Sequence, residues 1–210
     1  MNERELFTAY GVDIAVLDFF GDAFQTVSNS SLFFRHSEVQ GGSFPVLRFH
    51  LGLDTACWSY GQSNPALVSR LIICPSPLEA ISWLSFHHKS CSDMDQLLFI
   101  ATGDIPGQQC YDLVIQTYKR KNIALVMGAD LLGRICDIRI VTRIMGIECR
   151  FRLTDNGQVL ILYKGKQFLF EQDTISLNAF EKACGLRSGI RTYKPKKHAS
   201  FFSLLSGLSS

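Results

Sequence analysis

Short apolar runs alternate with helical patterns through the middle of the chain. Residues 71–74 (Leu-Ile-Ile-Cys) are entirely apolar, as a strand buried on both faces must be. The Ser-Pro-Leu-Glu sequence at 76–79 then supplies the cap, the first-turn proline and the acid that begin a helix. Further apolar strands are predicted at 97–101 and 123–127, and each precedes a helical pattern. The alternation predicts an α/β fold with a parallel sheet whose strand ends lie at one edge.

The chain on either side of this core follows other patterns. Residues 2–21 predict a helical hairpin, and apolar runs separated by glycine turns between residues 31 and 60 predict strands. After Gly146 the apolar period changes to two, and Asn156-Gly157 predicts a hairpin with a type I′ turn. We therefore expect four parts: an N-terminal α+β segment (1–66), the α/β core (67–146), a small β-rich module with a short helix (147–193) and a basic, partly mobile tail (194–210).

Composition is consistent with a folded protein and adds one asymmetry of charge. The chain has 210 residues, 47% of them hydrophobic, and a formal net charge of +2, so it can bury a sizeable core. Residues 150–197 hold 10 Lys or Arg against 4 Asp or Glu, and the remaining chain holds 11 against 15. A nucleic-acid or phosphate contact is therefore expected toward the C-terminal part. A solvated face that only aids solubility explains the same asymmetry equally well.

The cysteines and the N-terminus bear on the compartment. The seven cysteines contain no C-x-x-C pair, and an odd number without framework spacing is typical of a reducing cytoplasm. The first residues lack the basic and apolar regions of a signal peptide, and no uncharged apolar run approaches the ~18 residues that span a bilayer. We therefore expect a cytoplasmic protein that does not bind membranes.

Two of the predicted strands end in a pattern that resembles a Toprim domain, the catalytic fold of bacterial primases, topoisomerases and some nucleases. Residues 71–82 and 123–134 carry the likeness, which extends over about residues 71–145. In that family the first strand ends in Glu and the third in Asp-x-Asp, and these carboxylates hold Mg²⁺. Pro75 stands at the glutamate position and Gly128 at the first aspartate, so only Asp130 remains. The resemblance implies the fold, and the substitutions argue against the activity.

The remaining acids near these strand ends are Glu79, Asp104 and Asp130. Mg²⁺ is usually held by one or two carboxylates with substrate phosphates, so losing two acids of three removes most of the site, and no cofactor is expected. Asp130 is also explained as a helix cap, Glu79 as part of a capping box and Asp104 as a loop acid before Pro106. Alternatively, the three form a relocated Mg²⁺ site.

Phosphate binding does not need a metal and survives the loss of the acids. Gly133 lets a backbone approach an anion closely, and Arg134 either neutralises a phosphate or covers the sheet edge. Phe201-Phe202 beside the basic tail would form a base-stacking tip. The tail itself adds three candidate phosphate ligands, Lys194, Lys196 and Lys197.

Together these features predict a non-catalytic protein that binds nucleic acid or a partner. The resemblance implies descent from a primase-like Toprim protein and a role in DNA replication or in mobilisation of a mobile element. The expected partners are DNA, RNA or a protein of such an assembly. Two alternatives remain: a Mg²⁺-dependent nuclease or nucleotidyl transferase that uses the relocated acids, and an α/β interaction module with no nucleic-acid role.

Overall fold

A five-stranded mixed sheet lies at the centre of the molecule. The computed structural model describes residues 3–21, 23–28, 31–34, 43–45, 57–91 and 93–207. The strand order in the central sheet is β11-β7-β5-β6-β4, and β4 alone runs antiparallel to its neighbour. The strands span Trp58–Gly61 (β4), Arg70–Cys74 (β5), Leu97–Ala101 (β6), Asn122–Leu125 (β7) and Arg191–Thr192 (β11). The predicted mixed α/β class is confirmed, and the three predicted core strands are adjacent and parallel.

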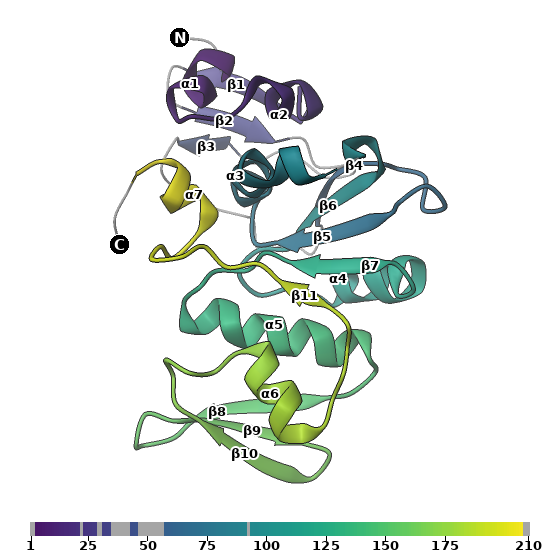
Figure 1. Cartoon of the computed structure of the whole chain (residues 1–210), viewed down its shortest axis with the longest axis vertical. Coiled ribbons are helices and arrows are strands. Elements are labelled where there is room, and N and C mark those ends of the chain that lie inside the picture. The colour runs from purple at the N-terminus through teal and green to yellow at the C-terminus, as the bar shows by residue number, and fades with distance from the viewer. Residues whose placement is uncertain are drawn as a thin grey trace.

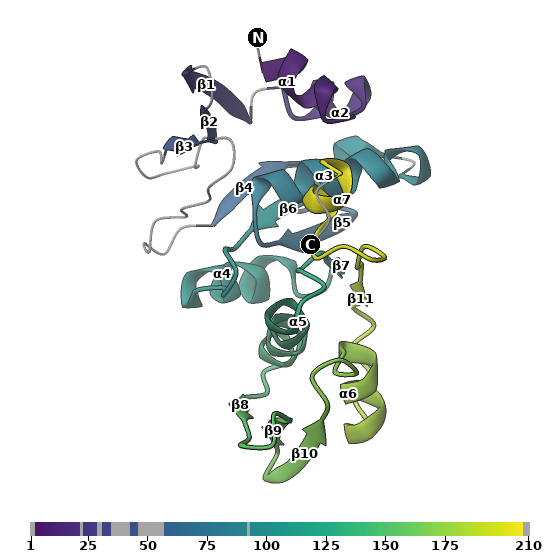
Figure 2. The same ribbon diagram turned by 90° about the vertical axis from the view of Figure 1, so that its left-hand side faces the viewer.

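Helices cover both faces of this sheet (Figures 1 and 2). The first face packs against α1 (Glu3–Ala9), α2 (Ile14–Phe19), α3 (Pro77–His87) and α7 (Phe201–Leu205). The opposite face packs against α4, the π-helical turn η3 and α5. These span Gln108–Leu113 (α4), Val114–Tyr118 (η3) and Leu131–Ile144 (α5), and two 3₁₀ turns span His88–Ser90 (η1) and Met94–Gln96 (η2).

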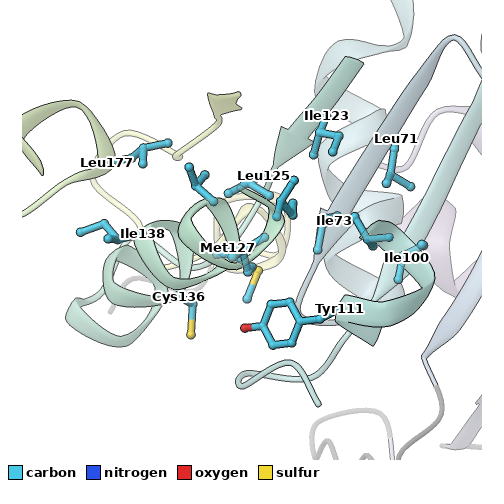
Figure 3. Close-up of a cluster of buried hydrophobic side chains, with 14 of the residues drawn as sticks. Leu71, Ile73, Ile100, Tyr111, Ile123, Leu125, Met127, Cys136, Ile138 and Leu177 are labelled. Atoms are coloured by element: carbon cyan, nitrogen blue, oxygen red, sulfur yellow. The ribbon is translucent and has the colours of Figure 1, made fainter. Parts of the chain in front are cut away.

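The strands are apolar throughout because both of their faces are buried. Along β5, Ile72 and Cys74 pack toward α3, whereas Leu71 and Ile73 pack toward α5. Figure 3 shows the second of these clusters, in which sheet side chains meet Tyr111 of α4 and side chains of α5. Alternation along each strand divides the apolar residues between two cores, as a covered parallel sheet requires.

A second, antiparallel sheet follows α5. It has the order β10-β9-β8 and packs against α6. The elements span Cys149–Leu153 (β8), Val159–Tyr163 (β9), Lys166–Phe170 (β10) and Leu177–Cys184 (α6). The predicted hairpins and short helix are confirmed, with Ser176 as the N-cap of α6 and Gly185 as its left-handed C-cap.

The predicted turn type at Asn156-Gly157 is wrong. Leu153 pairs with Val159, so five residues join β8 to β9, and Gly157 is the only one of them with positive φ. The two-residue turn with positive φ at both positions is Lys164-Gly165, between β9 and β10. Loop length selects the turn type, and only the second connection is short enough for type I′.

The predicted boundaries do not coincide with the sheets. β4 comes from the segment assigned to residues 1–66, and β11 comes from the module assigned to residues 147–193, yet both belong to the central sheet. A separate three-stranded sheet contains β1 (Phe24–Ser28), β2 (Ser31–Phe34) and β3 (Ser43–Pro45). The remainder of the predicted strand region, residues 35–42 and 46–56, lies outside the described residues.

The cysteines pair in a way that the sequence pattern did not predict. Cys57 and Cys110 form a disulfide, which the cysteine spacing did not predict because the two residues meet only in the folded chain. The other five cysteines are free. Among the described helices, none has both the length and the apolar character needed to cross a bilayer.

Candidate functional site

The C-terminal chain folds back across the edge of the sheet where the parallel strands end (Figure 1). The Tyr193 N–H donates to the Leu125 carbonyl (2.8 Å), which continues the pairing of β11 with β7. Further on, the Ala129 N–H donates to the Ala199 carbonyl (2.7 Å), and α7 then packs against α3. Residues 194–207, predicted as a partly mobile tail, are therefore bonded to the core of the domain.

Lys194 is held at the end of β7. Its Nζ donates to the carbonyls of Met127 (2.9 Å) and Gly128 (2.8 Å) and lies 2.7 Å from Oδ2 of Asp137. The Asp137 side chain is only 2% exposed, whereas that of Lys194 is 25% exposed. One ammonium group therefore bonds to two carbonyls and to one oxygen of a buried carboxylate, so it is engaged within the chain.

Burial controls the charge of this cluster. It raises the pKa of Asp137 from 3.8 to about 6, because removal from water outweighs the attraction and hydrogen bond of Lys194. Oδ1 of Asp137 has no hydrogen-bond partner among the described residues, which adds to the cost of its charged form. The sequence signal for this site is an acid between the apolar residues Cys136 and Ile138, which was not among the predicted site residues.

Glu79 serves a second helix besides its own. Its backbone N–H donates to Oγ of Ser76 (3.1 Å), which confirms Ser76 as the cap of α3, but the predicted capping box is not formed because the Glu79 side chain bonds elsewhere. Its carboxylate accepts from the backbone N–H groups of Phe201 (2.6 Å) and Phe202 (3.1 Å) at the start of α7. Burial raises the pKa of Glu79, and these two amides oppose the rise. The buried carboxylate therefore anchors the C-terminal helix to α3.

The other two predicted acids are placed differently. Oδ1 of Asp130 accepts from the Gly133 N–H (2.8 Å), so Asp130 caps α5, as the simpler interpretation predicted. Asp104 is exposed in the loop after β6. Within the described part of the chain, no three His, Cys, Asp or Glu side chains are grouped to hold a metal ion. The structure does not bring Glu79, Asp104 and Asp130 together as a metal site.

Gly133 and Arg134 both have structural roles. A Cβ at Gly133 would lie 2.6 Å from the backbone carbon and nitrogen of Gly128, so the first turn of α5 can pack on Gly128 only without a side chain. Nε of Arg134 donates to the Ala129 carbonyl (2.8 Å), and Nη1 donates to the Asp173 carbonyl (2.5 Å). The guanidinium therefore joins the turn after β7 to the loop before α6.

Of the five predicted phosphate ligands, only Lys196 and Lys197 have exposed side chains that are not tied into the fold. Arg187 and Arg191, which were not among the predicted ligands, are also exposed on the same stretch of chain. Within the described residues none of these four cations forms an ion pair. Their signal was the excess of positive charge after residue 150.

Several oxygen donors at the end of β7 are occupied by a cation of the chain itself. The carbonyls of Met127 and Gly128 and Oδ2 of Asp137 are all bonded to the ammonium of Lys194. A second cation there would meet direct repulsion, and Mg²⁺ also requires near-ideal octahedral geometry.

No protein-family model, no curated protein and no solved structure matches this chain.

Proposed function

We propose that this chain is a non-catalytic, nucleic-acid-binding protein derived from a Toprim primase-like ancestor, acting in replication or mobilisation of a mobile element. The observation that carries the proposal is the ammonium of Lys194 at the end of β7, bonded to the Met127 and Gly128 carbonyls. This is the strand end at which the resemblance expects the metal-binding Asp-x-Asp motif. A fixed positive charge from the protein itself takes the place of the metal.

Strand adjacency supports the same ancestry. β5 and β7 are neighbours in the sheet, with Ile73 paired to Leu125, so Pro75 and Gly128 follow adjacent strand ends. These are the two positions at which the resemblance expects acids that share one metal. The helix starting at Leu131 and the tight contact of Gly133 with Gly128 place Asp130 as a cap. The geometry therefore favours a fold retained without its metal chemistry.

Nucleic acid is the favoured ligand because exposed cations follow the chain from the end of α6 to α7. Without internal ion pairs in the described structure, they can neutralise phosphates and release condensed counterions. They also need no metal to do so. The residues are Arg187, Arg191, Lys196 and Lys197. A metal-dependent nuclease or transferase gains no support, since Glu79 and Asp130 are hydrogen-bonded within the fold.

The test is a titration of fluorescently labelled single- and double-stranded DNA, followed by anisotropy at about 50 mM and about 200 mM salt. We expect binding that weakens as salt rises. Replacing Lys196 and Lys197 together by alanine should weaken binding. On duplex DNA it should also reduce the salt slope, the decrease of log K per unit of log salt concentration, by about 2, because each phosphate contact contributes ~0.9 to that slope.

The matched control removes the same charge elsewhere. Lys119 and Arg120 are exposed at the opposite end of β7, before the strand begins, and their double alanine variant should keep the wild-type salt slope. Absence of DNA and RNA binding even at the lower salt concentration would refute the nucleic-acid role and favour the interaction module. Cleavage of the DNA on adding Mn²⁺ would refute the non-catalytic assignment.

A further inference from the structure

The sheet of β8, β9 and β10 has one face that no part of the described chain covers. One face packs against α6 through Val159, Ile161 and Tyr163. In Figure 2 α6 lies on one side of these strands, and none of the other described elements lies on the far side. Strand alternation directs a second set of side chains to that far side: Arg150, Arg152, Leu160, Leu162, Gln167 and Leu169.

The register makes these six side chains one surface. Leu160 pairs with Arg152 on one side and with Leu169 on the other. Leu162 pairs in the same way with Arg150 and Gln167. Directly opposed residues of antiparallel strands have Cβ atoms ~5 Å apart, so the leucines form a continuous patch bordered by the two arginines. We call these six residues the outer β-face.

The chemistry of the outer β-face differs from that of an ordinary solvated sheet. A strand with one face toward water normally carries polar residues at the positions on that face. Both outward positions of β9 are leucine instead, and Leu169 of β10 is 58% exposed. Arg150 and Arg152 are exposed and form no ion pair with a described residue. An apolar centre with arginines at its border is typical of a protein-binding surface.

We propose that the outer β-face binds an acidic, amphipathic segment of a protein partner. Apolar side chains of the segment pack on Leu160, Leu162 and Leu169, and its carboxylates pair with the two arginines. Arg150 and Arg152 are two residues apart on one strand, about 6.6 Å, and carboxylates one helical turn apart have a comparable spacing of ~6 Å. The pair therefore matches two acids on one side of a helix, each able to accept a bidentate bond.

Other occupants fit less well. A second copy of the chain, docked through the same face, would bring four arginines and no acid into one interface. Single-stranded nucleic acid binds on aromatic platforms, and the outer β-face has aliphatic side chains where bases would stack. Both remain outcomes of the test. The proposal is independent of the nucleic-acid proposal, because it uses none of the residues Arg187, Arg191, Lys196 and Lys197.

The probe is a synthetic peptide of about 18 residues with leucine at helical i, i+3, i+4 and i+7 spacing and glutamate on the flanking positions. It is titrated into the full chain, and binding is followed by ¹H–¹⁵N chemical shifts. We expect shifts confined to β8, β9 and β10. Replacing Arg150 and Arg152 together by alanine should weaken binding at least tenfold, and a peptide with lysine in place of glutamate should not bind.

The control variant replaces Lys164 and Lys166 by alanine, which removes the same charge from the same module outside the outer β-face and should leave the affinity within twofold. A Leu169→Ser variant, altered at an exposed site, should weaken binding while keeping the chemical shifts of the core. The proposal is overturned if shifts stay absent at millimolar peptide or if the lysine peptide binds equally. It is also overturned if an oligonucleotide or a second copy occupies this face instead.

Discussion

Lys194 is the residue on which the sheet edge depends. It reaches back from the C-terminal chain to carbonyls 66 and 67 positions earlier and neutralises Asp137 on α5. Buried charges are tolerated only when they are paired and hydrogen-bonded, and Nζ meets both conditions. Asp137 is less well satisfied, because its Oδ1 lacks a partner among the described residues. The pair of Lys194 and Asp137 therefore holds the C-terminal chain against this edge of the sheet. The negative charge of Asp137 nevertheless lowers the stability of the folded state.

Replacing Asp137 by asparagine should change how stability depends on pH. The folded-state pKa of Asp137, about 6, lies above its ordinary 3.8, so the folded chain binds the proton of this carboxyl group more tightly than the unfolded chain does. The resulting contribution to the free energy of unfolding is fully present below about pH 4 and is lost as pH rises to about 6. The free energy of unfolding of the wild type, relative to Asp137→Asn, should fall on the order of 3 kcal/mol across that window.

Urea unfolding at several pH values from 4 to 7 measures this difference. Asp104→Asn, which removes an exposed carboxyl near the same strand ends, is the matched control and should keep the wild-type pH profile. Parallel profiles for wild type and Asp137→Asn would contradict the assigned role of burial.

At the scale of elements, α7 depends on contacts outside itself. A helix of five residues has too few internal hydrogen bonds to be stable alone. Ser200 caps it locally, Glu79 binds its first two amides, and Phe201 is buried against α3. The helix therefore forms because the far end of the chain meets a carboxylate 122 residues earlier.

Glu79→Ala should release α7 while the sheet remains folded. The Phe201 and Phe202 amides would lose charged acceptors, at a cost of about 1–3 kcal/mol in local stability. We expect these two amides to exchange hydrogen roughly 10- to 100-fold faster, with the amides of β5 unchanged. Glu79→Gln keeps one acceptor oxygen and should give a smaller increase. Unchanged exchange at Phe201 and Phe202 in the alanine variant would show that α7 is anchored by other contacts.

At the scale of the whole molecule, the Cys57–Cys110 disulfide joins the start of β4 to α4 across 53 positions of sequence. A cross-link over such a loop restricts the unfolded chain by about 4 kcal/mol in the chain-entropy account. It therefore ties the edge strand of the central sheet to the helical layer. The other five cysteines are free.

Reduction should lower the stability of the wild type toward that of Cys57→Ser, by about 2–4 kcal/mol. Thermal unfolding with and without dithiothreitol measures the change, and alkylation followed by mass spectrometry counts the free thiols. Cys57→Ser should not respond to the reductant, whereas Cys91→Ser, which removes a free thiol, should respond like the wild type. Seven alkylated thiols in the untreated protein would show that the cross-link does not form.

The sequence by itself determined the core strands and the caps of two helices. Apolar runs predicted β5, β6 and β7, and Ser76 and Asp130 predicted the starts of two helices, because strand burial and helix capping act over a few residues. The same short range explains why the cap, one of the two interpretations of Asp130, is the one that the structure confirms. The turn at Lys164-Gly165 was less evident, since lysine rarely adopts positive φ.

Only the tertiary structure decided what the sheet edge contains. The bonds from Lys194 to Asp137, from the start of α7 to Glu79 and between Cys57 and Cys110 join residues 53 to 122 positions apart. No local period or cap encodes such pairs, because they exist only after the layers have packed and brought distant groups into one low-dielectric space. Whether a carboxylate holds a metal, caps a helix or pairs with a lysine is therefore decided by the tertiary packing around it.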